Sequence, residues 1–251
     1  MNENTVPRSG TEALDKALDV LELLADASSP LGVTAVARAL DMPKSTAHRL
    51  LTAFTRRGYV EQTEAGYGLG MKLVSLGLGV LAEEPIAFAA RPVLDALAES
   101  IHETSFIVRA RAGKLFVLAK VEGTSMLRAS PRVGAEVPVH ATAAGRLYLA
   151  FSPGEVRIGE GPYERFTACT PTSASALAAK VAAAKEAGVD ENVDEWLDGL
   201  AVVSAPVFRG GALEGVLACA MPSSRYVDRA QVRASVKAAA DEIGRRMEGR
   251  A

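Results

Sequence analysis

The stretch PKSTAHRLLTAFTRRGYV, residues 43–60, constrains the fold more than any other part of the chain. Its apolar side chains follow the i, i+3, i+4, i+7 spacing of one helical face: Ala47, Leu50, Leu51 and Phe54. Pro43 suits the first turn of such a helix, because its missing N–H would find no partner there. Gly58 then ends the helix. The stretch is therefore predicted to form an amphipathic helix that packs on a core through this face.

The opposite face of this helix is cationic and contains no carboxylate. It carries Lys44, Ser45, His48, Arg49, Thr52 and Arg56. A helix that enters the major groove of DNA needs short side chains near its N-terminus, cations and imidazoles that reach bases and phosphates, and no carboxylate facing the DNA backbone. This pattern favours a DNA-binding helix. The alternative is a solvated basic helix in an unrelated helical domain.

The neighbouring segments complete a recognisable arrangement. Residues 11–27 place Leu14, Leu18, Leu21 and Ala25 on one helical stripe, and residues 34–40 form a second short helix. Only two residues, 41 and 42, separate it from the third helix. Residues 59–70 read as two short strands around a turn at 64–66. Three short helices followed by a two-stranded wing are typical of a winged helix-turn-helix.

The predicted DNA contacts differ by their place on this unit. Ser45 and Thr46 lie beside the helix N-terminus, whose dipole favours anions, and are expected to donate to phosphates. His48 and Arg49 are the candidates for base edges. Arg56, Arg57 and Tyr67 are expected to meet phosphates or the minor-groove side of the wing. Lys44, the cation in the first turn of the helix, completes the set.

Composition supports an ordinary globular protein with a local DNA-binding surface. The chain of 251 residues is 49% hydrophobic and 23% charged, enough for one large or two modest domains. Its net charge is −2, and residues 1–70 hold seven Lys/Arg against nine Asp/Glu, so cations must be sorted onto one face. No apolar run of 18 residues and no signal core occurs, so we expect a cytoplasmic protein with no membrane partner.

The rest of the chain predicts an α+β fold. Residues 1–10 are expected to be a flexible N-terminus, 11–70 the winged helix-turn-helix, 71–84 a linker helix and 85–251 a second domain. Beyond the helix that ends near Ile101, strands are predicted around 105–110, 114–121, 200–208 and 212–220. Helices are predicted within 141–151, 173–187 and 225–248. This irregular alternation of strands and helices is typical of α+β domains.

Nothing in the second domain predicts catalysis, a metal or a cofactor. His140 lies near neither a GxSxG nor an HExxH motif, and it is more consistent with helix capping or a core hydrogen bond than with a general base. Cys169 and Cys219 lack metal-ligand spacing and are expected to be buried. Residues 77–82 match the GxGxxA dinucleotide fingerprint, but Glu83-Glu84-Pro85 interrupts the helix that this fingerprint requires. We therefore expect no cofactor and no metal.

The sequence also resembles a known family. The segments VLELLAD, GVTAVARALDMPKSTAHRLLTAFTRRGYVEQ and YGLG resemble the DNA-binding half of the IclR family of bacterial transcription regulators. VEG at 121–123, LR at 127–128, VG at 133–134, PVHATAAGRLYLA at 138–150 and DEWLDGLAVVSAPVF at 194–208 resemble its effector-binding half. The similarity runs in order over about residues 12–245. It implies a linker helix, a C-terminal GAF-like domain that binds a small-molecule effector, and homodimers or homotetramers on double-stranded operator DNA.

The resemblance also implies where the effector binds. The implied pocket wall consists of His140, Ala143, Ala144, Asn192, Glu195, Val202, Ala218 and Ala220. Family members that hold small oxo-acids tend to carry hydroxyl or thiol side chains on these strands, where this chain has Val202, Ala218 and Ala220. We therefore expect an effector with substantial apolar or aromatic surface and one or two polar groups. The same apolar residues would also suit central strands that enclose no ligand.

Two departures from the family pattern and two rival classes complete the interpretation. Arg146 stands where the family usually has Lys, and Met221 replaces a usual Gly. An enzyme with a structural helical domain would require a nucleophile or metal cluster near His140. A dimerisation scaffold would require DNA affinity that hardly responds to Arg49 and His48. The leading prediction is a transcription regulator whose effector changes the spacing or order of paired winged helices.

Overall fold

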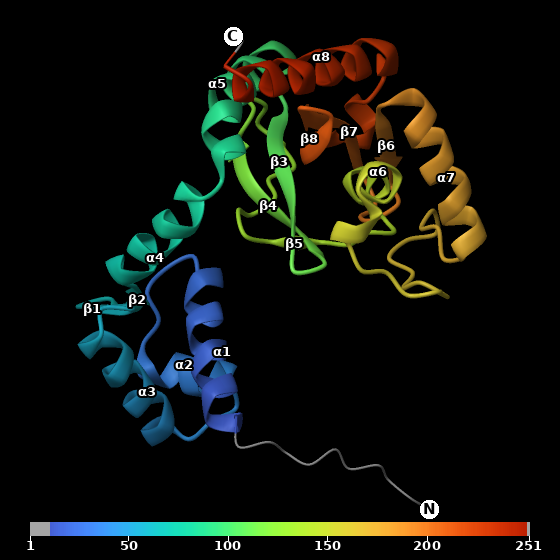
Figure 1. Cartoon of the computed structure of the whole chain (residues 1–251). Coiled ribbons are helices and arrows are strands. Elements are labelled where there is room, and N and C mark those ends of the chain that lie inside the picture. The colour runs from blue at the N-terminus through green and yellow to red at the C-terminus, as the bar shows by residue number, and fades with distance from the viewer. Residues whose placement is uncertain (1–10, 250–251) are drawn as a thin grey trace, which may run out of the picture. The chain divides into compact units, whose positions relative to one another are not determined.

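A computed structural model describes residues 11–249, so the prediction for residues 1–10 lies outside the described part. The chain separates into two compact units at the Glu83–Glu84 boundary (Figure 1). The elements of the first unit are α1 (Glu12–Asp26), α2 (Val33–Ala39), α3 (Lys44–Arg56), β1 (Val60–Thr63), β2 (Gly66–Leu69) and α4 (Met71–Ala82). Three helices and an antiparallel β1–β2 hairpin form a winged helix-turn-helix.

The core of the first unit lies between α1, α2 and α3. Val20, Leu24, Val36, Ala47 and Leu51 are buried there. Pro43 precedes α3 as its N-cap residue, one position earlier than predicted, and Gly58 follows the helix with a φ of 77°, which only glycine adopts readily.

The stripe predicted for α1 is not the buried one. Leu14 and Leu18 are 58% and 48% exposed, while Val20 and Leu24 face the core. The buried stripe lies one residue earlier along the helix than the predicted stripe. Since both stripes have helical spacing and apolar members, periodicity alone does not distinguish them.

The second unit is built on one six-stranded antiparallel sheet of order β5-β4-β3-β8-β7-β6. Its strands are β3 (Thr104–Arg111), β4 (Lys114–Val121), β5 (Glu136–Val137), β6 (Asp190–Val193), β7 (Leu200–Arg209) and β8 (Ala212–Pro222). Its helices are α5 (Pro85–Ile101), α6 (Ala143–Phe151), α7 (Ala174–Ala187) and α8 (Arg229–Met247), with short 3₁₀ turns at Pro153–Glu155 and Ser223–Arg225.

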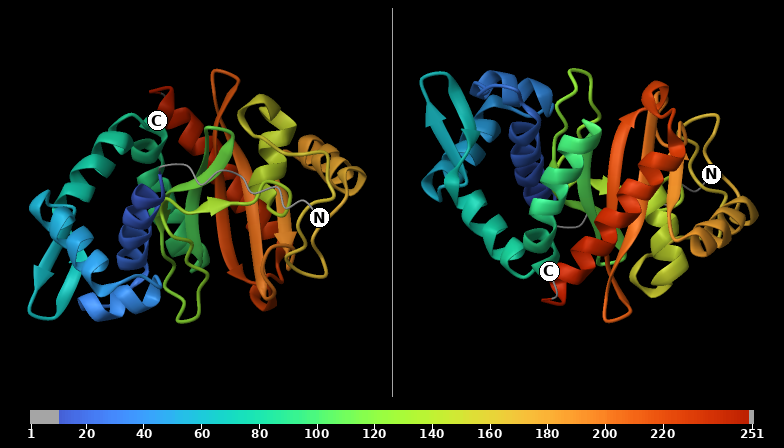
Figure 2. Two further views of the ribbon diagram at one scale, coloured as in Figure 1. Left: turned by 90° about the horizontal axis from the view of Figure 1, so that it is seen from below. Right: turned by 90° about the horizontal axis from the view of Figure 1, so that it is seen from above.

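Helices cover both faces of this sheet (Figure 2). α5 and α8 pack on the face that presents Ile107, Val203 and Leu217. α6 packs on the opposite face, which presents Phe106, Val202 and Ala218, and α7 lies beside α6. Successive residues of a strand point to opposite faces, so Phe106 and Ile107 belong to different cores. The face under α6 carries three of the residues predicted to bind an effector: Val202, Ala218 and Ala220.

The structure corrects the predicted elements at three points. β5 and β6 were not expected, because neither short segment shows strand alternation; β6 has the polar sequence DENV and forms by pairing with β7. Cys219 is buried as expected, but Cys169 is exposed. Cys169 lies in an irregular segment between α6 and α7, where no core covers it.

The helices of the described residues include none that is individually long and apolar enough to span a membrane. Only α4 and α5 taken together, with the break between them, reach that length and composition, and α5 contributes six buried residues to the core of the second unit.

Candidate nucleic-acid interface and ligand cavity

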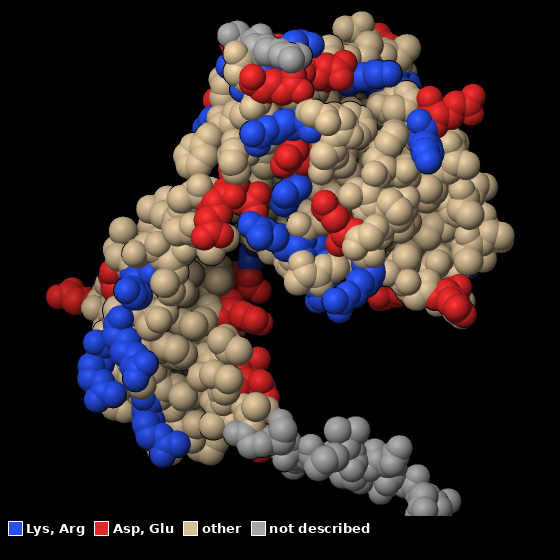
Figure 3. All heavy atoms as spheres, viewed as in Figure 1, with Lys and Arg blue, Asp and Glu red and all other residues tan. Residues whose placement is uncertain are grey.

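The exposed face of α3 carries the predicted DNA contacts. Lys44, Ser45, His48, Arg49, Arg56 and Arg57 are exposed, and Thr46 is half-buried. Within residues 11–249, no carboxylate pairs with the Lys and Arg side chains of this face. In Figure 3, Lys and Arg gather over α3, whereas Asp and Glu lie over α1 on the other side of this unit. Sorting of charge, rather than net charge, makes this face electropositive.

The N-terminus of α3 adds to this surface. Pro43 precedes the helix with an extended backbone, and none of the side chains in the described part of the chain caps the first turn. The first N–H groups of a helix lack intrahelical partners, and the helix dipole is positive there. The first turn, with Lys44 and Ser45 exposed on it, is therefore suited to an anion such as a phosphate.

Tyr67 does not belong to the exposed face, contrary to the prediction. Its side chain is buried in the core of the first unit, and its backbone N–H and carbonyl pair with those of Leu31 at 2.9 Å. β2 is thereby held between β1 and the segment before α2. Tyr67 anchors the wing and does not present its ring to a ligand.

A cavity lies in the second unit on the α6 face of the sheet. One part, of about 190 Å³, is lined by Phe106, Ala129, Ser130, Pro131, Trp196, Leu197, Leu200, Val202 and Ala220. A smaller part, of about 20 Å³, adjoins it through Phe106, Trp196 and Val202, and is also lined by Val108, Val137, Thr142, Ala144, Asn192 and Ala218. Five predicted pocket residues therefore line this cavity: Ala144, Asn192, Val202, Ala218 and Ala220.

The start of α6 is fixed tightly beside the cavity. The Thr142 hydroxyl donates to the Pro138 carbonyl at 2.7 Å and accepts from the Gly145 N–H at 3.1 Å. A Cβ at Gly145 would lie 1.9 Å from the carbonyl oxygen of Val139, so only glycine permits this close approach. Ala144 is thus held at the cavity wall.

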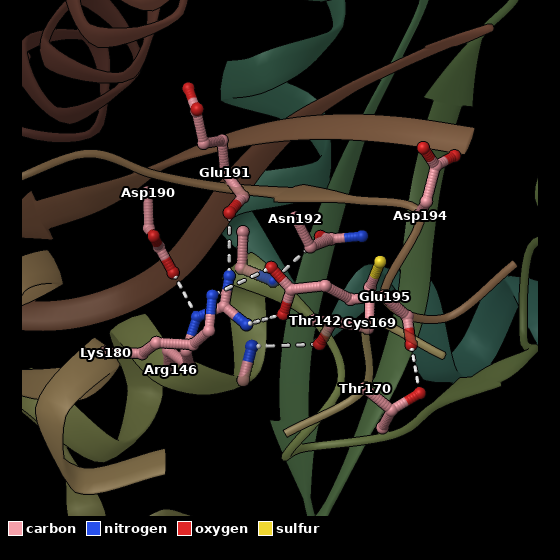
Figure 4. Close-up of polar contacts among 12 residues, drawn as sticks. Thr142, Arg146, Cys169, Thr170, Lys180, Asp190, Glu191, Asn192, Asp194 and Glu195 are labelled. Atoms are coloured by element: carbon pink, nitrogen blue, oxygen red, sulfur yellow. Dashed lines mark hydrogen bonds and ion pairs between the residues drawn. The ribbon is translucent and has the colours of Figure 1, made fainter. Parts of the chain in front are cut away.

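A buried ion cluster lies behind this wall (Figure 4). The Arg146 side chain is fully buried; its Nε donates to Asp190 at 2.5 Å, its Nη1 to Glu195 at 2.7 Å and its Nη2 to the Glu191 carbonyl at 2.8 Å. Lys180 adds a second contact to Glu195, at 3.0 Å. Burial raises the pKa of the Asp190 carboxyl, against the opposing attraction of Arg146.

Two predicted pocket residues, Glu195 and Ala143, lie close to the cavity but do not line it. The Glu195 carboxylate is occupied by Arg146 and Lys180. Ala143 is buried, and its N–H donates to the side-chain Oδ1 of Asn192 at 2.9 Å. Hydrogen bonds within the chain thus occupy both.

His140 lies apart from this cavity. Its ring stacks on Tyr163 and Phe166, with centroids 5.2 and 5.4 Å away, and its Nε2 contacts the Glu164 carbonyl at 2.9 Å. It lines a separate open depression beside Gly113. His140 therefore does not line the cavity under α6, and the prediction of a core hydrogen bond agrees with this geometry.

The predicted pocket set also missed important wall residues. Trp196, Phe106 and the segment Ala129–Pro131 were not predicted, although Trp196 is the only tryptophan of the chain and lies within the quoted motif DEWLDGL. The position of Trp196 in this motif could have indicated its place in the cavity wall. Phe106 and Pro131 gave no such signal, because their place at the cavity depends on strand order and on the β4–β5 loop. Of the described residues, no group of His, Cys, Asp and Glu is arranged to hold a metal ion.

Comparison with known proteins decides the family. The profile of the IclR helix-turn-helix domain matches residues 13–64, and that of the bacterial transcriptional regulator IclR C-terminal domain matches residues 78–245. The chain belongs to the IclR family. This confirms the predicted family resemblance and the predicted fold class. The family consists of transcriptional regulators and not of enzymes.

Individual IclR relatives agree with this assignment. The probable transcriptional regulator SauR of Cupriavidus necator is 32% identical over 199 residues, which cover 77% of this chain and 79% of that protein. The crystal structure of Thermotoga maritima IclR matches with a TM-score of 0.78 at 23% identity, covering 93% of this chain and 98% of that one. An IclR homologue of Microbacterium hydrocarbonoxydans complexed with 4-hydroxybenzoate matches with a TM-score of 0.75 at 21% identity, covering 94% and 99%. The two solved structures support the fold.

Proposed function

We propose that this IclR-type regulator recognises double-stranded operator DNA through the exposed face of α3. His48 and Arg49 meet base edges in the major groove, and Lys44, Ser45, Thr46, Arg56 and Arg57 meet phosphates. The observation that carries this proposal is the set of exposed cations on α3 that no carboxylate of the described chain neutralises. Residues 11–70 form the DNA-binding domain, 71–84 the linker and 85–251 the effector domain. The site of action is the cytoplasm, where bacterial operator DNA lies.

Comparison of two arginine variants tests the role of α3. Arg49→Ala is expected to weaken binding to the selected operator by roughly 1–3 kcal/mol, because a base contact is lost. Arg57→Ala is expected to weaken binding to all sequences and to lower the salt slope by about one. Lys16→Ala on α1 serves as the control, since Lys16 pairs with Glu12 outside this face. Binding to operator and random duplexes across a salt series measures all three. Equal operator affinity of wild type and Arg49→Ala would contradict the proposal.

We further propose that the cavity under α6 holds the effector. Its walls are mainly apolar, so the effector has substantial apolar or aromatic surface and few polar groups. The family neighbour complexed with 4-hydroxybenzoate supports a ring-sized ligand. The ligand acts by preferring one arrangement of paired DNA-binding units. Tight binding of glyoxylate or pyruvate alone, measured by calorimetry, would contradict this assignment.

We also propose that the protein works as a homodimer or homotetramer. α4 is apolar, yet no residue of it is buried within the described chain. Met71, Leu78 and Val80 are 67%, 60% and 61% exposed. An apolar helix with no intramolecular cover is typical of an interface with another chain. A second copy of the chain would provide that cover.

A further inference from the structure

The polar groups around the cavity are almost all occupied within the chain. No charged side chain of the described residues lines either part of the cavity. The Thr142 hydroxyl both donates and accepts at the start of α6. The Ser130 hydroxyl lies 2.6 Å from both Glu122 and Lys120. The buried cation nearest in sequence to this wall, Arg146, is matched by Asp190 and Glu195. The cavity therefore offers a ligand no compensating charge of either sign.

Asn192 is the exception among the buried polar side chains that line the cavity. It is fully buried, and its Nδ2 is one of the few buried side-chain nitrogens of residues 11–249 without a hydrogen-bond partner. Its Oδ1 accepts the Ala143 N–H at 2.9 Å. Since a backbone N–H can only donate, the amide oxygen must face Ala143 and the amide nitrogen must face away. In Figure 4 this nitrogen points away from Arg146, and no contact reaches it.

A buried donor of this kind favours a ligand with an acceptor. An unsatisfied buried N–H costs free energy, and a ligand oxygen placed within hydrogen-bonding distance of it would remove that cost. A carboxylate oxygen could accept this bond too, but a carboxylate would lose its hydration in a cavity that supplies no cation, which is far more costly. A neutral carbonyl oxygen accepts the bond without this penalty.

The remainder of the cavity suits a single ring. Phe106, Trp196 and Val202 line both of its parts. An apolar protein cavity of roughly 150 Å³ binds benzene, and the larger part here measures about 190 Å³. Aromatic walls also stack favourably with an aromatic ligand.

We propose that the effector is an uncharged aromatic carbonyl compound, of the aryl ketone, aldehyde or ester class, whose oxygen accepts a hydrogen bond from Asn192. Asn192 is then the residue that selects neutral ligands with an acceptor from hydrocarbons and from aromatic carboxylates. This inference rests on the proposed function of the cavity as the effector site and names the chemistry that it selects.

Three nearly isosteric probes test the proposal with the full-length protein. Acetophenone has the ring and a neutral acceptor, ethylbenzene has the ring alone, and benzoate has the ring and a charge. Binding is measured by calorimetry, and quenching of Trp196, the only tryptophan, reports binding near this cavity. Acetophenone is expected to bind about 10-fold more tightly than ethylbenzene. It is expected to bind at least roughly 100-fold more tightly than benzoate.

A variant then assigns the selectivity to Asn192. Asn192→Leu removes the donor, so the acetophenone-to-ethylbenzene affinity ratio is expected to fall from about 10 to about 1. The matched control is Val202→Leu, which reduces the cavity volume; it is expected to weaken both probes while leaving their ratio unchanged. If Asn192→Leu fails to fold, the comparison of the three probes on the wild type still decides the proposal.

Each outcome counts for or against the proposed ligand class. Equal affinity for acetophenone and ethylbenzene, benzoate binding at or above acetophenone, or binding of none of the probes would each overturn it. Operator binding by the same preparation separates the two proposals. If the protein still binds operator DNA and responds to a charged small molecule, the regulatory function stands and only the neutral aromatic class is lost.

Discussion

The charged groups of α3 and those around Arg146 follow opposite rules. On α3, Arg49 and Arg56 are exposed, and no carboxylate of the described chain pairs with them. Around α6, Arg146 is fully buried, and Asp190 and Glu195 occupy its guanidinium. Groups left open by the chain are available to a partner outside it, whereas groups satisfied inside the chain maintain its own fold. The apolar side chains differ in the same way between α4, which buries none, and α5, which buries six.

The largest expected effect concerns the enclosed cation. Arg146→Met leaves the largely buried Asp190 without its cation and leaves Glu195 with only the partly exposed Lys180, so we expect the free energy of unfolding of the second unit to fall by about 3–5 kcal/mol. Burial already raises the pKa of Asp190, and this raised pKa would rise further without the cation. Denaturant unfolding followed by Trp196 fluorescence measures the loss.

Two controls separate this effect from the loss of a positive charge as such. Lys180→Met removes the other, 43% exposed, partner of Glu195 and is expected to cost less than about 1 kcal/mol. Arg49→Ala, on the open surface of α3, is expected to change stability by no more than about 0.5 kcal/mol. A loss below about 1 kcal/mol for Arg146→Met would remove the proposed distinction between enclosed and open cations.

The open apolar helix predicts an intermediate effect. Val80 is 61% exposed on α4, and its burial in an interface between two copies would make Val80→Ala cost roughly 1–2 kcal/mol, or about 10-fold in the dissociation constant of the oligomer. Val227→Ala is the matched control, because Val227 is 82% exposed and lies outside any helix. Sedimentation over a concentration series measures both variants. Equal dissociation constants for the two variants would exclude α4 as the interface.

The same contrast explains what the sequence could predict. The face of α3 depends on spacing within one helix, so all the predicted DNA contacts except Tyr67 are on its exposed side or at its ends. Tyr67 is buried because β2 also pairs with Leu31, a residue that lies far from β2 in the sequence. The cavity depends on contacts between distant strands. The family resemblance identified Val202, Ala218 and Ala220 as cavity residues. It could not show that the Glu195 carboxylate forms an ion pair with Arg146, or that Phe106 lines the same cavity.

The smallest expected effect concerns the loop between β4 and β5, which supplies Ala129, Ser130 and Pro131 to the cavity wall. Glu122 holds this loop: its carboxylate contacts Ser130 at 2.6 Å, Lys120 at 2.9 Å and Arg128 at 3.0 Å. These contacts, with the Ser130 hydrogen bond foremost, lower the pKa of Glu122 from 4.5 to about 2. The contacts are exposed and therefore individually weak. Glu122→Gln is expected to raise the dissociation rate of acetophenone about two- to threefold at low salt, and less at high salt.

The pH dependence gives this last comparison a sharper form. A carboxyl group whose pKa is lowered in the folded state stabilises that state fully above its unfolded pKa, here about 4.5, and loses this contribution as the pH falls through about 2. The Glu122 contacts should therefore persist at pH 5, and the wild-type dissociation rate, measured by stopped-flow quenching of Trp196, should not change between pH 7 and pH 5. Glu136→Gln, which removes an exposed pair with Lys114 outside this loop, is the matched control and should leave the rate unaltered. A wild-type rate that rises between pH 7 and pH 5, or an equal rate in Glu122→Gln and Glu136→Gln, would show that these exposed charges do not hold the wall, and that only enclosed groups shape this cavity.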